Sequence, residues 1–198
     1  MVCSGQRQDM ASTVHYEIPV ERGRERFREL IVYISGKCER DASFGATKLN
    51  KVLFYSDFEA FRRFGRPLTG LPYFRLRNGP APKWLVTIRR DLIREGAIIL
   101  EQEVVGSGYV QDRTIAQRPA FLDLFTQSEL ALVDSIIEQL WAKSAGAVSK
   151  ESHGVAWATR HDLEPIPYEA AFLSDDKLTA DEQSRFTQLG RERGWQSA

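Results

Sequence analysis

The chain has 198 residues, and its 27 basic residues balance its 27 acidic ones, so the formal net charge is zero. This balance gives no overall attraction to nucleic acid or to an anionic membrane, and an apolar content of 42% is that of an ordinary globular protein. No run reaches the ~20 apolar residues of a membrane-spanning helix. The length predicts a single domain over 24–198, and the polar residues 1–23 are expected to form a flexible tail.

The location of the protein is predicted from its N-terminus and its cysteines. The first 25 residues lack the apolar run of a signal peptide. The two cysteines are Cys3, in the expected tail, and Cys38, so a structural disulfide is not expected. Both features favour a reducing compartment, and we therefore expect a cytoplasmic protein without a membrane partner.

Apolar residues at helical spacing predict a first helix over about 24–39 and a second over 46–64. In the second helix the apolar side chains wrap most of the circumference, which is typical of a central, buried helix. Gly65 is a natural end for this helix, and Pro67 directs the chain out of helical geometry.

The middle of the chain predicts short strands around one helix. Residues 73–77 alternate weakly, as in a strand, and 78–82 consist of turn-forming residues. One of the prolines in that turn can open a helix over about 83–95. Two strands at 97–105 and 109–116 then follow, joined by a turn at Gly106-Ser107-Gly108.

In the C-terminal part, Thr126 and Glu129 have the spacing of a capping box ahead of an apolar run, which predicts a helix from Thr126. A weaker pattern predicts a helix over 149–159, residues 163–171 are expected to be extended, and a last helix is expected from Thr179 to about Arg193. Together these elements predict an α+β fold that is mainly α-helical. Its centre is a buried helix with packed helices around it and a small antiparallel sheet or hairpin.

Two separated segments resemble a known family. The first is the run Lys48-Leu49-Asn50-Lys51-Val52-Leu53-Phe54-Tyr55-Ser56-Asp57, followed by Gly65-Arg66-Pro67-Leu68-Thr69-Gly70, Tyr73 and Asn78-Gly79-Pro80-Ala81-Pro82. The second is Ser152-His153, Trp157 and Glu164-Pro165-Ile166-Pro167-Tyr168-Glu169-Ala170-Ala171. In order and spacing they resemble the Panacea domain family, the SocA-like antitoxins, over about Glu25 to Gly194.

The resemblance implies an antitoxin that binds a protein toxin from a neighbouring gene and neutralises it by direct contact. In the SocA branch the antitoxin instead delivers its toxin to a protease as an adaptor. Neither mode is catalytic, so the resemblance implies no enzyme activity and no cofactor. The motif residues expected to have structural roles are Lys48, Tyr55, Asp57, Gly65, Pro67, Thr69, Gly70, Gly79, Pro80 and Pro82.

Several residues of the chain could have either a structural or a chemical role. Asp57, on the apolar helix, needs partners if it is buried, and we expect it to cap backbone N–H groups or to pair with an arginine of the following loop. His153 and Trp157 share a helix face at a spacing of four, as a packed pair or as a partner contact. Cys38 and His153 could be drawn as a nucleophile and a base, but Cys38 lies on an apolar stripe and is expected to pack there. No cluster of ligands predicts a metal site.

Charge is segregated along the chain although its sum is zero. Nine basic residues and one acid lie between Arg62 and Arg94, whereas 121–142 holds four acids and no base. Either these charges pair within the chain, or the arginines form an outward patch for an acidic or nucleic-acid-binding partner. The candidate partner-binding residues are Arg62, Arg63, Arg66, Lys83, Arg90, Arg94, His153 and Trp157.

The main alternative is a DNA-binding regulator. A helix at 83–95 followed by a hairpin at 97–116 fits a winged-helix-like element. Against it, the hairpin carries Glu101, Glu103 and Asp112 with Arg113 as its one base, and an acidic wing repels phosphate. Nucleic acid is therefore not the expected partner. An enzyme is third, because no catalytic motif has the required spacing.

Overall fold

The computed structural model describes residues 14–105, 108–173 and 179–192. Its elements in chain order are α1 (Gly23–Lys37), α2 (Ala46–Phe64), β1 (Tyr73–Leu76), β2 (Gly79–Pro82), α3 (Leu85–Arg94), β3 (Ile98–Val105), β4 (Tyr109–Ala116), a 3-10 turn η1 (Leu122–Leu124), α4 (Gln127–Leu140), α5 (Ala145–Glu151), α6 (Val155–Ala158), β5 (Pro165–Ile166), a 3-10 turn η2 (Tyr168–Phe172) and α7 (Ala180–Glu192). The expected α+β fold with mainly helical content is confirmed. None of the described helices is both long and apolar enough to cross a membrane.

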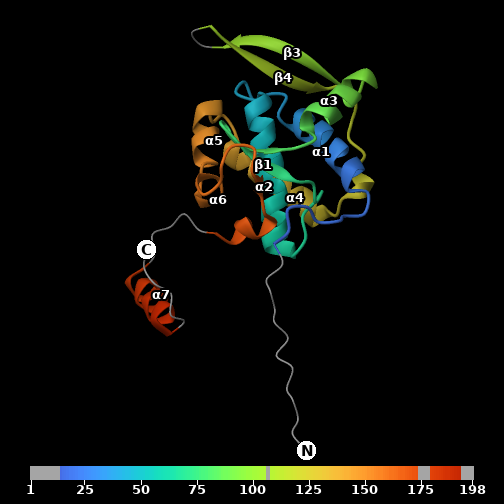
Figure 1. The fold of residues 1–198 in the computed structure, drawn as a ribbon. Coiled ribbons are helices and arrows are strands. Elements are labelled where there is room, and N and C mark those ends of the chain that lie inside the picture. Colours follow the sequence, from blue (N-terminus) through green and yellow to red (C-terminus); the bar gives the residue numbers. More distant parts are fainter. Residues whose placement is uncertain (1–13, 106–107, 174–178, 193–198) are drawn as a thin grey trace, which may run out of the picture.

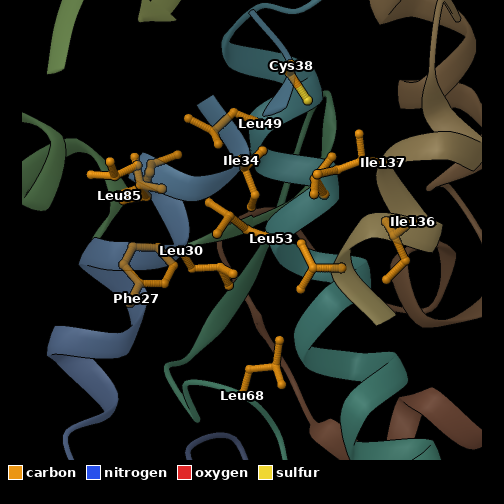
Figure 2. Packing of buried hydrophobic residues seen from close by; sticks show 14 of the residues in the cluster. Phe27, Leu30, Ile34, Cys38, Leu49, Leu53, Leu68, Leu85, Ile136 and Ile137 are labelled. Carbon is orange, nitrogen blue, oxygen red and sulfur yellow. The ribbon is translucent and has the colours of Figure 1, made fainter. Parts of the chain in front are cut away.

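Helix α2 runs through the middle of the molecule, with α1, α4 and α5 around it (Figure 1). Ten of its 19 residues are buried, so the expected central helix is confirmed. On one side, Leu49 and Leu53 pack with residues of α1 and α4 in the main apolar cluster (Figure 2). On the other side, Phe54 and Phe58 form a second, aromatic cluster with residues of β1, β5 and η2. Burial of this apolar surface is the main force that stabilises the fold.

The small sheet has the strand order β2-β1-β5, with antiparallel pairs. Sequence analysis took residues 78–82 for a turn, which is wrong for 79–82, because these residues form strand β2. The N–H of Lys83 donates to the carbonyl of Pro72 at 3.0 Å, so in this register Pro80 and Pro82 direct their backbone away from β1. At the outer edge of a sheet the missing N–H of a proline leaves no ladder bond unmade.

Strands β3 and β4 form a separate two-stranded ribbon that projects from the body (Figure 1). The two predicted strands are confirmed within one residue. The predicted turn residues Gly106 and Ser107 lie outside the described residues. The half of the ribbon nearer its turn is fastened to the loop between α1 and α2, because the Gln111 side chain donates to the carbonyls of Ala42 and Phe44, each at 3.2 Å.

The predicted single helix at 149–159 is wrong. The chain forms α5 and α6, and the break between them lies at Ser152–Gly154, where the Ser152 hydroxyl donates to the carbonyl of Ser149 at 2.7 Å. Such local side-chain bonds compete with helix continuation. The expected extended stretch at 163–171 is also only partly correct, because just Pro165–Ile166 pair as a strand and η2 follows.

Helix α4 begins as predicted, and its N-terminal cap also contacts α1. Thr126 and Glu129 form the expected capping box, in which the Glu129 carboxylate accepts from the N–H of Thr126 at 2.8 Å. The same buried carboxylate accepts from Arg26 of α1 at 2.9 Å. The cap therefore also joins α1 to α4.

Residues 14–22, which sequence analysis assigned to the tail, contact the domain. The N–H of Ile18 donates to the carbonyl of Gly70 at 3.0 Å, and the N–H of Tyr168 donates to the carbonyl of His15 at 2.8 Å. Residues 1–13 of the expected tail lie outside the described residues.

Candidate protein-docking site

The family-motif residues lie on and around α2. Asp57 is fully buried and accepts from the N–H of Thr69 at 2.7 Å, from the Thr69 hydroxyl, and from the Tyr73 hydroxyl at 2.8 Å. It thus caps a backbone N–H, and its partners are N–H and O–H groups rather than an arginine. Burial raises the pKa of the Asp57 carboxyl, although the hydrogen bonds from Thr69 and Tyr73 oppose this shift. This cluster holds the loop after α2 against the helix.

Two lysines of α2 are also buried, and their surroundings differ. Lys48 forms an ion pair with Asp41 at 2.6 Å, which ties α2 to the loop before it. Lys51 donates to the carbonyl of Pro80 at 2.8 Å, at the outer edge of β2. Burial lowers the pKa of Lys51 to about 7. Sequence reasoning assigned no role to Lys51, although a lysine within a helix that is apolar nearly all round was the available signal.

The motif glycines permit close approach of other segments. Gly79 has φ +92, and a Cβ there would lie 2.2 Å from the Ser152 hydroxyl oxygen and 2.7 Å from Nζ of Lys51. Gly70 has φ +71, and a Cβ there would lie 1.9 Å from the carbonyl oxygen of Ile18. Gly65, also at φ +71, ends α2 in left-handed geometry with open space around it.

The remaining motif residues lie in or beside the two apolar clusters. Tyr55 is half-buried and touches both clusters. Pro67, Pro80 and Pro82 are buried. All ten motif residues are therefore close to α2, and most of them are inaccessible to a partner.

His153 and Trp157 do not share a helix, since His153 lies in the break between α5 and α6. Their rings still stack, with centroids 3.9 Å apart. The Trp157 ring also lies 4.2 Å from the Arg75 guanidinium, and its Nε1–H donates to the carbonyl of Leu76 at 2.7 Å. These contacts fasten α6 to β1. Burial lowers the pKa of His153, and the positive charges of Lys51 and Arg75 lower it further.

Cys38 is buried at the end of α1, as its apolar stripe predicted. Burial raises the pKa of its thiol to about 12, so the thiol keeps its proton at neutral pH. Cys3 lies outside the described residues. Within the described part of the chain, no group of three or more His, Cys, Asp or Glu residues is placed to hold a metal ion.

The predicted partner-binding arginines fall into two groups. At the end of α2, Arg62 and Arg63 bind Glu59, and Arg66 reaches Glu129 at 3.3 Å. On α3, Arg90 is exposed and Arg94 lies 3.3 Å from Asp91. The start of α3 lies beside the start of α2, whereas Asp91, farther along α3, lies 4.0 Å from Arg24 at the start of α1.

A groove lies between α3, the β1–β2 hairpin and the start of α2. Its volume is about 480 Å³, and its walls include the exposed apolar side chains of Leu76, Val86 and Leu163. Val86 is 72% exposed and Leu163 is 66% exposed. Exposed apolar side chains that gather in one place are typical of a surface that contacts another molecule.

Two cations line this groove. The Lys83 ammonium lies 5.5 Å above the ring centre of Phe74 and 5.1 Å from that of Trp84. The helix expected over about 83–95 begins at Leu85, so Lys83 precedes α3 and is not part of it. Arg89 is half-buried, and burial lowers the pKa of its guanidinium while the charge of Asp112 opposes the shift. Sequence reasoning named Lys83 but missed the groove, because three separated segments build it.

The geometry of the winged-helix alternative is present, since α3 precedes the β3–β4 ribbon. The ribbon carries exposed Glu101, Glu103 and Asp112, and Arg113 is engaged with Glu103 at 2.9 Å. A surface of this charge disfavours contact with phosphates.

The fold and the groove define a small, mainly helical protein with a buried central helix and an apolar surface groove. A family model described as "Antitoxin SocA-like, Panacea domain" matches residues 49–158, which is more than half of the chain. The chain therefore belongs to the SocA-like Panacea antitoxin family, as the sequence motifs predicted. Neither the curated proteins nor the solved structures gave a match.

Proposed function

We propose that this protein is an antitoxin that binds a toxin from a neighbouring gene and blocks it by direct contact in the cytoplasm, without catalysis. The observation that carries the proposal is the family match over residues 49–158, which runs from α2 to α6. The buried polar groups of α2 support the part of the proposal that excludes catalysis. Asp57, Lys48 and Lys51 all bind groups of their own chain, so they act within the scaffold.

The test is co-expression of this chain with the product of the adjacent reading frame. We expect the antitoxin to restore growth and to co-purify with the toxin in a stoichiometric complex. Rescue should persist, with toxin levels unchanged, in a strain that lacks its energy-dependent proteases. Rescue that disappears in that strain, with the toxin accumulating, would identify a protease adaptor instead. Absence of both rescue and complex, with both proteins expressed, contradicts the proposed function.

We also propose the basic face of α3 as part of the contact, because Arg90 and Arg94 are exposed there. The variant Arg90→Glu with Arg94→Glu is expected to weaken the complex without unfolding the domain. A matched control is Arg185→Glu with Arg191→Glu, since both arginines are exposed on α7. Rescue by the α3 variant that equals the wild type would exclude this face.

A further inference from the structure

We propose that the groove between α3, the β1–β2 hairpin and the start of α2 is the docking site for an apolar segment of the toxin that carries a carboxylate side chain. This inference rests on the proposed function and adds the site and the chemistry of the bound segment.

The apolar part of the argument comes from exposure. Leu76, Val86 and Leu163 belong to β1, α3 and the loop before β5, yet they line one groove of about 480 Å³. This volume lies in the range of roughly 300–1,000 Å³ that is typical of ligand-binding pockets. Apolar side chains form no hydrogen bonds with water. An apolar occupant that covers them therefore stabilises the complex in proportion to the apolar area that it removes from water.

The charged part of the argument comes from pairing. Arg62, Arg63 and Arg94 each bind an acid of this chain. In the described ranges, by contrast, Lys83 and Arg89 form no ion pair with a carboxylate; Lys83 lies over aromatic rings, and the charge of Asp112 acts on Arg89 without a direct ion pair.

Lys83 and Arg89 place positive charge beside apolar walls. This surface is complementary to a toxin segment in which a carboxylate lies among apolar side chains. The guanidinium of Arg89 suits this task, because its planar fork binds both oxygens of a carboxylate and a half-buried position limits competition from water. The apolar walls favour a protein segment over a nucleic-acid backbone, which would need several cations and a polar surface.

The first experiment measures binding of the co-purified toxin to variants with matched controls. Val86→Asp is compared with Val104→Asp, because these valines are 72% and 70% exposed and Val104 lies on the β3–β4 ribbon outside the groove. Lys83→Glu is compared with Lys150→Glu, an exposed lysine of α5. Each groove variant should weaken the Kd roughly tenfold or more, whereas each control should change it less than about twofold.

Equal effects of a groove variant and its control would overturn the assignment. If the wild-type chain rescues growth and Val86→Asp binds the toxin as well as the wild type, the groove proposal fails while the proposed function stands. If the wild type itself neither rescues nor binds, the proposed function fails.

The second experiment identifies the occupant by placing a photo-reactive benzoylphenylalanine at position 86 in the complex. The expected cross-link joins position 86 to an apolar toxin segment with an Asp or Glu among its near neighbours. A toxin segment without an acid overturns the charge argument. A cross-link to residues 180–192 of the same chain, to a second copy or to nucleic acid overturns the choice of partner.

A third measurement does not need the toxin. Anilinonaphthalene sulfonate is an apolar anion, so it should bind the isolated chain in this groove. Lys83→Glu and Val86→Asp should each lower its affinity severalfold, with Lys150→Glu and Val104→Asp as controls. Unchanged dye binding by both groove variants contradicts the proposed chemistry of the groove, whatever the toxin does.

Discussion

At the scale of single residues, the interior of this protein depends on polar groups that bind their own chain. Asp57 accepts hydrogen bonds from Thr69 and Tyr73, and Lys51 donates to Pro80. These groups are buried, so each bond replaces hydration that the group has lost. Removing one partner therefore costs more than the bond itself contributes, because the other partner stays buried and unpaired.

Asp57→Ala should lower the free energy of unfolding by about 3 kcal/mol, because it leaves the buried N–H and hydroxyl of Thr69 without their acceptor. Urea unfolding followed by circular dichroism measures this change. The control is Asp123→Ala at an exposed position, which should change stability by less than about 0.5 kcal/mol. Similar stability of the two variants would show that the Asp57 cluster does not stabilise the fold.

Lys51 gives a pH dependence of known sign. Its pKa is about 7 in the folded chain, below its usual value of 10.5, so between these values the unfolded chain binds more protons. The free energy of unfolding of the wild type should therefore rise with pH across this window.

Relative to Lys51→Met, the wild type should gain about 2 kcal/mol from about pH 7 to about pH 9. Urea titrations of both proteins at several pH values measure the difference. This range lies above the titration of His153, whose pKa is lowered. A difference between the two proteins that does not change with pH would show that Lys51 has an ordinary pKa.

At the scale of elements, the β1–β2 hairpin lies against α2, and the absence of a side chain at Gly79 lets Lys51 and Ser152 come close to it. The backbone of Pro80 and Pro82 points away from β1. This edge of β2 therefore presents carbonyls but no N–H groups at these two residues. The Lys51 ammonium supplies the donor that this edge needs. The hairpin is therefore specified by helix α2 as much as by its own residues.

Gly79→Ala should lower the free energy of unfolding by roughly 2–4 kcal/mol, because it adds a steric clash to an unfavourable φ of +92. The control Gly96→Ala has φ +71 with nothing within 4 Å of the added Cβ, so it should cost about 1 kcal/mol. Thermal unfolding of both variants separates the clash from the backbone strain. Equal costs would mean that the clash is relieved by movement of Ser152 and Lys51.

At the scale of the whole molecule, α2 belongs to both apolar clusters. The aromatic cluster is completed by Ile166 and Tyr168, which lie beyond the residues that match the family model. Tyr168 stacks on Phe58 at 4.9 Å, and its hydroxyl donates to the carbonyl of Leu71 at 2.7 Å. Because one helix supports both clusters, we expect them to unfold together.

Tyr168→Ala should lower the free energy of unfolding by about 4 kcal/mol, through lost burial and a cavity beside Phe58. Circular dichroism and tryptophan fluorescence should report a single transition with one shared midpoint, in the variant as in the wild type. A second transition in the variant would show that the aromatic cluster and its segment form a separate cooperative unit.

Local sequence signals were sufficient where an element depends on its own residues. The apolar residues around the whole of α2, the Thr126–Glu129 cap and the family motifs were all readable from spacing, because helix periodicity and capping are local properties. They failed at β2 and at the break between α5 and α6. Strand β2 depends on its pairing with β1, and the break after α5 involves a hydrogen bond from the Ser152 side chain to Ser149. The spacing of apolar residues reveals neither of these contacts.

The sequence by itself determined the family, the central helix and the mainly helical class, since each rests on residues close together in the chain. The tertiary structure decided which lysines are buried, how Asp57 is satisfied and where the groove lies. Leu76, Val86 and Leu163 share a surface only after the chain has folded, because burial and charge pairing depend on which distant segments meet.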